Sequence, residues 1–194
     1  MEELKPLEQL GEPDERHQFF VVRDTPSSPY RKIAAADFHQ MAEHASLHAD
    51  VPEEVRSHFA MAQNLLAHSW YCYPFNVAAQ LHAYISVEFA LRTRLKAPDS
   101  AQFKKLLKEA MDLGLIRSDG FTYGREPEQQ PYPPNTTVPG APVEIRDYAT
   151  DVADAMRSLR NDLAHGTNML NMKGGTVLLV CSELINQLFV VPQA

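Results

Sequence analysis

The sequence predicts an all-α protein. Apolar residues recur at spacings of three and four through most of the 194 residues, whereas no segment alternates apolar and polar residues as a strand does. The 14 prolines gather mainly in two regions and leave the periodic stretches almost free of them. With 44% hydrophobic residues and no repeat of solenoid length, the chain can bury one core. We therefore expect a helical bundle.

Six helices are expected from the apolar periodicity. In chain order they cover 34–49, the stretch after Pro52 to about 70, 75–96, the stretch after Ser100 to about 111, 143–165 and 176–190. Four prolines punctuate the first thirty residues, which are expected to form an extended arm, and six more fall within 125–142. Because proline fixes φ and lacks the amide donor, 125–142 is predicted to be an irregular surface loop.

Composition excludes several classes of protein. The net charge of −7 excludes a generally basic nucleic-acid coat protein. The only two cysteines, Cys72 and Cys181, are too few for a disulfide framework or a zinc ribbon, which favours a reducing, cytoplasmic setting. The longest apolar run, Val177 to Cys181, is too short to span a membrane, and the acidic N-terminal residues lack a signal-peptide core.

The most informative stretch is SLRNDLAHG at 158–166, at the end of the fifth predicted helix. Asn161 and His165 are one helical turn apart and share a face, whereas Arg160 lies about 140° around the helix from His165. Arginine grips phosphate through its planar fork, and histidine exchanges a proton near neutral pH. Together these three side chains have the chemistry to orient a phosphodiester and move a proton without a metal or other cofactor.

The run RNDLAH at 160–165 resembles the Arg-x4–6-His motif of the HEPN superfamily (higher eukaryotes and prokaryotes nucleotide-binding), and Gly166 is also common there. The flanking helices extend the resemblance. The stretch 79–96 looks like the earlier core helix of the family, with Glu88 in its apolar stripe. The stretches 99–116 and 178–189 look like the following and closing helices, and 125–142 like an insertion.

The resemblance implies an arrangement of the chain. Residues 73–194 would form the HEPN-like helical domain, and 1–72 an N-terminal arm with accessory helices packed on it as part of one compact unit. Family members often form homodimers that bring two motifs into one cleft.

The resemblance also implies two classes of function. Many members are metal-independent endoribonucleases of toxin–antitoxin, defence and RNA-processing systems, and in this class Arg160, Asn161 and His165 would be catalytic, with RNA as substrate and an antitoxin as partner. Other members are non-catalytic binding or dimerisation modules for RNA, a nucleotide or a protein partner. Bundle pattern alone does not separate the two classes, because both require it.

Glu88 occupies a position where an apolar residue is expected, and an unpaired buried carboxylate is costly. It either supports the site by pairing with Arg160 or Arg157 of the motif helix, or lies partly exposed at the edge of the stripe.

A positive cluster lies within 91–108, which carries six basic residues and one acidic residue. It either guides RNA, through Arg92, Arg94, Lys96, Lys104 and Lys105, or forms an ordinary solvated helix face.

His44 and His48 are spaced as two ligands on one helix, but the adjoining residue is Ala45 rather than the glutamate of a metalloprotease motif. Surface histidines and no metal site are therefore expected there.

Overall fold

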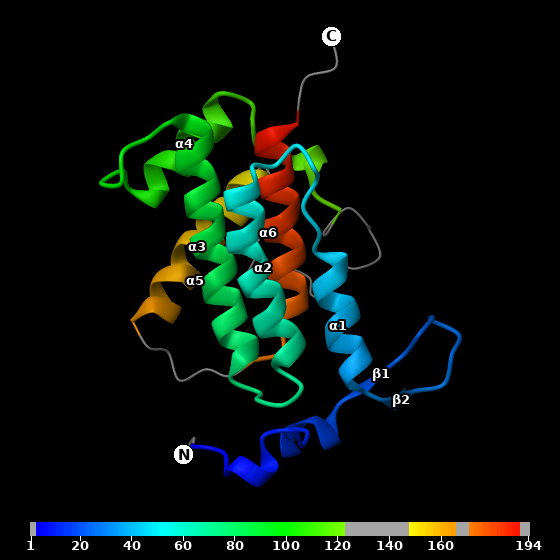
Figure 1. Cartoon of the computed structure of the whole chain (residues 1–194). Coiled ribbons are helices and arrows are strands. Elements are labelled where there is room, and N and C mark those ends of the chain that lie inside the picture. The colour runs from blue at the N-terminus through cyan, green and yellow to red at the C-terminus, as the bar shows by residue number, and fades with distance from the viewer. Residues whose placement is uncertain (1–2, 123–147, 166–170, 191–194) are drawn as a thin grey trace, which may run out of the picture.

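The computed structural model describes residues 3–122, 148–165 and 171–190, and within these ranges the chain is mostly helical (Figure 1). Six α-helices are present in them: α1 (Ala35–His44), α2 (Glu53–His68), α3 (Phe75–Leu95), α4 (Phe103–Asp112), α5 (Tyr148–Ala164) and α6 (Gly174–Phe189). Short 3-10 helices cover Leu7–Gln9, Glu15–Phe19 and Ser118–Gly120, and a small antiparallel ribbon joins β1 (Val21–Val22) to β2 (Arg31–Lys32). The all-α prediction is confirmed. None of the described helices has the length and apolar character needed to cross a membrane.

Three predicted features lie outside the described residues. They are the proline-rich loop 125–142, the first residues of the fifth helix at 143–147, and Gly166, which follows the motif.

The central helix of the bundle is α3, which packs against α2, α4, α5 and α6. Figure 1 shows α2 and α6 running beside it, with α5 crossing behind. Small buried residues along α3, namely Ala79, Ala83 and Ala90, let these neighbours approach closely, and Val87 and Leu91 fill the space between them. Every helix that carries a candidate site residue is therefore positioned by contact with α3.

The accessory helix α2 belongs to the same core as the helices after residue 73. Its buried stripe of Val55, Phe59, Ala62 and Leu66 recurs at spacings of four, three and four, and this stripe joins the hydrophobic core that includes α3 and α6. Pro52 is the N-cap of α2, since the chain enters the helix at Glu53.

The prediction that the first helix continues to residue 49 is wrong. Helix α1 ends at His44, and Ala45 already leaves the helical region with φ −83° and ψ 62°. The cause is tertiary: the Gln63 side-chain amide donates to the carbonyls of Ala42 and Ala45, both at 2.9 Å, and Asn186 donates to the Ser46 carbonyl at 3.0 Å. These side chains satisfy the carbonyls that a longer helix would have used. His44 and His48 therefore do not share a helix.

The beginning of α6 is fixed by close packing on α3. The Asn76 side-chain oxygen accepts the Gly174 amide at 2.9 Å and so caps the helix two residues before the predicted start. A Cβ at Gly174 would lie 2.8 Å from both that oxygen and Leu66 Cδ1, which explains the absence of a side chain there.

An aromatic cluster attaches the N-terminal arm to the bundle. The buried ring of His17 stacks on Trp70 at 5.1 Å between centroids and also contacts Phe38 and Tyr73. Its Nε2 donates to the Ser69 carbonyl at 2.9 Å, which fixes the tautomer because a carbonyl only accepts.

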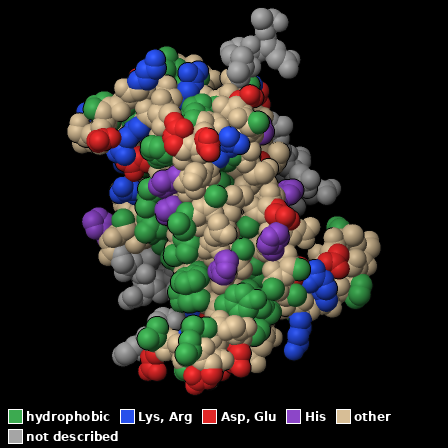
Figure 2. All heavy atoms as spheres, viewed as in Figure 1, with side chains coloured by type: hydrophobic (Ala, Val, Ile, Leu, Met, Phe, Trp, Pro, Cys, Tyr) green, Lys and Arg blue, Asp and Glu red, His purple; other side chains and the backbone are tan. Residues whose placement is uncertain are grey.

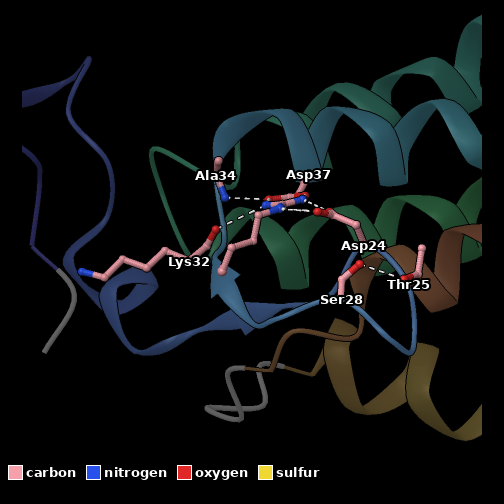
Figure 3. Close-up of polar contacts among 7 residues, drawn as sticks. Asp24, Thr25, Ser28, Lys32, Ala34 and Asp37 are labelled. Carbon is pink, nitrogen blue, oxygen red and sulfur yellow. Dashed lines mark hydrogen bonds and ion pairs between the residues drawn. The ribbon is translucent and has the colours of Figure 1, made fainter.

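A second attachment ties the ribbon to the start of α1 (Figure 3). The Arg31 guanidinium bridges Asp24 and Asp37, with N–O distances of 2.6 Å to each carboxylate. Asp37 also accepts the backbone amide of Ala34 at 2.7 Å and so caps α1 from within its first turn. The hydrogen bonds from Arg31 lower the pKa of Asp37 against the opposing effect of burial.

Two stacked histidines join α2 to α3. The rings of His58 and His82 lie 4.7 Å apart between centroids and are nearly parallel, at 9°. The Ser86 hydroxyl donates to the His82 carbonyl at 2.9 Å, so the Nδ1 of His58 donates to Ser86 Oγ at 2.8 Å. Burial, with a smaller contribution from His82, lowers the pKa of His58.

The lowered pKa of His58 predicts a pH-dependent stability. Below the ordinary histidine pKa of about 6.5, His58 binds a proton in the unfolded chain but not in the folded chain. The free energy of unfolding is therefore highest above that pH and declines below it, by at most about 1.4 kcal/mol per pH unit for one group. His58→Gln should flatten this decline when the free energy of unfolding in urea is measured between pH 5 and 8. His39→Gln, an exposed control on α1, should leave it unchanged. Parallel profiles for the wild type and His58→Gln would contradict the assignment.

Candidate functional site

The motif helix α5 directs Arg160 inward because this residue continues its buried stripe. Ala149, Ala153 and Met156 are buried on the face toward the bundle, and Arg160 is the next position of the same series. Its guanidinium reaches α3, where Glu88 is only 7% exposed. Of the two interpretations of Glu88, the structure has the buried, paired one, and the partner on the motif helix is Arg160 and not Arg157.

Glu88 divides its carboxylate between two arginines. Its Oε1 accepts Nη2 of Arg92 at 2.5 Å, one turn along α3, and its Oε2 accepts Nη2 of Arg160 at 3.1 Å. The same Arg92 nitrogen also donates to the Ala101 carbonyl at 3.2 Å, in the segment that leads into α4. We call Arg92, Glu88 and Arg160 the Glu88 triad. It joins α3, α5 and the entrance to α4 through one buried charge.

The Glu88 triad is not neutral. Two guanidinium groups face one carboxylate, which leaves one net positive charge. The Arg160 side chain is 34% exposed, so its guanidinium is held in direction by Glu88 and still reaches solvent. A fixed, partly accessible guanidinium with excess positive charge is suited to binding an anionic oxygen.

Asn161 and His165 are placed differently from Arg160. Both are exposed, and the backbone amide of His165 donates to the Asn161 carbonyl at 3.0 Å, so they lie one turn apart as predicted. Helical geometry turns them about 100° and 140° from Arg160. Within one chain, Arg160 thus faces α3 while Asn161 and His165 face outward, and the three do not converge by themselves.

The predicted RNA-binding residues separate into two groups. Arg92 belongs to the Glu88 triad, and Arg94 donates from Nε to the Leu188 carbonyl at 2.6 Å, at the end of α6. Arg94 is nevertheless exposed, as are Lys96, at the end of α3, and Lys104 and Lys105, in the first turn of α4. Figure 2 shows Lys and Arg side chains gathered at the end of the bundle where α4 lies. Of these five residues, only Arg92 is partly buried.

The pairing of Arg92 with Glu88 has a signal in the sequence that the site prediction missed. Glutamate four residues before arginine on a helix is a favourable pair, and Arg92 follows Glu88 at that spacing.

Arg157 has its Nε buried without a hydrogen-bond partner, as have Arg92 and Arg160.

A cavity near the N-terminal ribbon lies away from the motif. It has a volume of about 580 Å³, lies between the β1–β2 ribbon, α1 and the start of α6, and none of the motif residues lines it. Arg31 on its wall is bound by both Asp24 and Asp37 and so is not free for a ligand. In residues 3–122, 148–165 and 171–190, no three histidines, cysteines or acidic residues are grouped to hold a metal ion.

Comparisons of the chain with family models, curated proteins and solved structures found no match. The chemistry of the chain is therefore inferred from its own residues: the motif on α5, the Glu88 triad and the basic end of α4.

The Glu88 triad predicts a stability loss in Glu88→Gln. The glutamine keeps the size of the side chain, but it removes the charge and turns an amide donor toward a guanidinium, at a cost of about 1–3 kcal/mol. Urea unfolding at neutral pH measures this cost. Glu109→Gln, an exposed change on α4, serves as the control and should fall within about 0.5 kcal/mol of the wild type. A Glu88→Gln protein as stable as the control would mean that the buried pairing contributes nothing.

Proposed function

We propose that the protein is a HEPN-like, metal-independent endoribonuclease that uses the 2′-hydroxyl of its RNA substrate as nucleophile. The observation that carries the proposal is the placement of Arg160: a buried carboxylate holds it, it stays 34% exposed, and it lies on the same helix as an exposed Asn161 and His165. A positioned guanidinium is worth more to a transition state than a mobile one, because no reorganisation is needed as charge develops.

The proposed reaction is a transesterification. The 2′-oxygen forms a bond to phosphorus, the bond from phosphorus to the 5′-oxygen breaks, and the proton lost by the 2′-hydroxyl is balanced by one gained at the 5′-oxygen. The products are a 2′,3′-cyclic phosphate and a free 5′-hydroxyl. Arg160 binds the phosphate oxygens, and His165 either transfers a proton or donates a hydrogen bond to the phosphate. Asn161 orients His165 or the sugar hydroxyl through its amide.

A homodimer is part of the proposal. Because Arg160 and His165 point in different directions from one helix, a second copy related by a two-fold axis can supply the group that the first copy turns away. An apolar groove of about 210 Å³ runs between α5 and α6, and Leu159 at its edge is 42% exposed. This groove is the surface that we propose for the second copy.

The second candidate function is a non-catalytic module that binds RNA, a nucleotide or a protein partner. It is favoured by one observation: the Glu88 carboxylate already occupies part of the Arg160 guanidinium, which leaves less of it for a reacting phosphate.

Cleavage of mixed RNA in EDTA tests the enzyme proposal. The wild type should cleave, and Arg160→Ala and His165→Ala should each lose about a hundredfold in rate, since each removes one group that acts in the transition state. The matched controls are Arg56→Ala and His39→Ala, which change exposed residues of α2 and α1. Expression of the wild type but not of the two motif variants should also slow cell growth if the protein is a toxin or defence effector.

Two outcomes would contradict the mechanism: cleavage that disappears in EDTA, or cleavage that is equal in the wild type and both motif variants. RNA binding without cleavage by the wild type would favour the non-catalytic module.

A further inference from the structure

The arginines around the Glu88 triad exceed what its carboxylate can neutralise. The Nε atoms of Arg92, Arg157 and Arg160 are all buried and lack a hydrogen-bond partner. Glu88 has two carboxylate oxygens, and Arg92 and Arg160 each take one of them. Arg157 is thus a half-buried arginine that does not pair with Glu88.

The position of Arg157 on α5 connects the two halves of the motif. It precedes Arg160 by three residues and Asn161 by four, so it is a neighbour of both on the helix surface. Successive steps of four also place Arg157, Asn161 and His165 in one row along α5. Around the helix, Arg157 lies about 60° from Arg160, on the side toward Asn161. Around the circumference of α5, Arg157 therefore lies between Arg160, which points inward, and His165, which points outward.

We propose that Arg157 is a second phosphate-binding residue of this site and holds an RNA phosphate adjacent to the one that Arg160 binds. The inference rests on the proposed RNA substrate, though not on its cleavage. Arg157 and Arg160 lie one turn apart on α5, and Glu88 is the one carboxylate that pairs with Arg160 and Arg92. The remaining positive charge is suited to binding two backbone phosphates. Because Arg157 contacts a phosphate away from the reacting bond, it contributes to substrate binding and not to the chemical step.

Binding of an uncleavable 2′-O-methyl oligoribonucleotide tests this role directly. Arg157→Ala should raise Kd about tenfold, as expected for one charge-assisted contact, and should reduce the slope of log K against log salt by about 0.7. Arg157→Lys keeps the charge and should recover the salt slope and most of the affinity. The control Arg56→Ala should match the wild type in both. In cleavage assays, Arg157→Ala should raise KM with kcat nearly unchanged, whereas Arg160→Ala lowers kcat.

The outcomes for the two proposals are separable. Arg157→Ala with wild-type affinity and salt slope would overturn the role of Arg157 even where RNA is cleaved. Arg157→Lys with the same loss as Arg157→Ala would overturn it too, since a structural role is indifferent to charge. If the wild type binds RNA through Arg157 but never cleaves it, the second phosphate contact stands and the ribonuclease proposal falls. Should Arg157→Ala fold poorly by circular dichroism, Arg157→Gln, which keeps most of the stem, replaces it in each comparison.

Discussion

The buried carboxylate of Glu88 requires positively charged partners, and this requirement determines how α3, α5 and the start of α4 are joined. Glu88 lies on the central helix, almost fully removed from water, where an unpaired charge would be strongly unfavourable. Its two oxygens bind Arg92 and Arg160, and Arg92 reaches onward to the Ala101 carbonyl. One charge therefore fixes the approach of α5, the direction of its arginine and the entry into α4. An apolar residue at this position would fill the same space, but it would leave Arg92 and Arg160 without their carboxylate partner and Arg160 without a fixed direction.

The geometry of a single α-helix then divides the candidate machinery. Arg160 continues the buried stripe of α5, while Asn161 and His165 occupy its solvent side. A ligand that contacts both Arg160 and His165 must extend around the helix past Arg157. Otherwise one of the two side chains must come from a second copy of the chain. The exposed Leu159 and the apolar groove beside α6 make the second arrangement physically reasonable. Both arrangements use the net positive charge of the Glu88 triad, to which α5 contributes Arg160.

Local pattern was enough to predict much of the fold and the one-turn spacing of Asn161 and His165 on α5. The buried stripes of α2 and α4 recur at helical spacings, and a buried ion pair was one of the two interpretations that the sequence left open for Glu88 on α3. What failed was decided by contacts between distant segments. Helix α1 stops at His44 because the Gln63 side chain takes the carbonyls of Ala42 and Ala45 and Asn186 takes that of Ser46, contacts that apolar periodicity does not predict. Arg94 makes a contact that the sequence did not indicate, because its Nε donates to the Leu188 carbonyl, 94 residues away. The β1–β2 ribbon has two residues in each strand, too few to show alternation.

The central claim is that Glu88 acts on function by fixing Arg160, and a double-mutant cycle on kcat/KM for RNA cleavage tests it most directly. If the two residues act as one unit, Glu88→Gln should reduce kcat/KM in the wild type but have little further effect in an Arg160→Ala background, with a coupling energy of about 0.5–3 kcal/mol. If the losses from the two single substitutions simply multiply in the double variant, Glu88 and Arg160 act independently, and Glu88 does not act through Arg160.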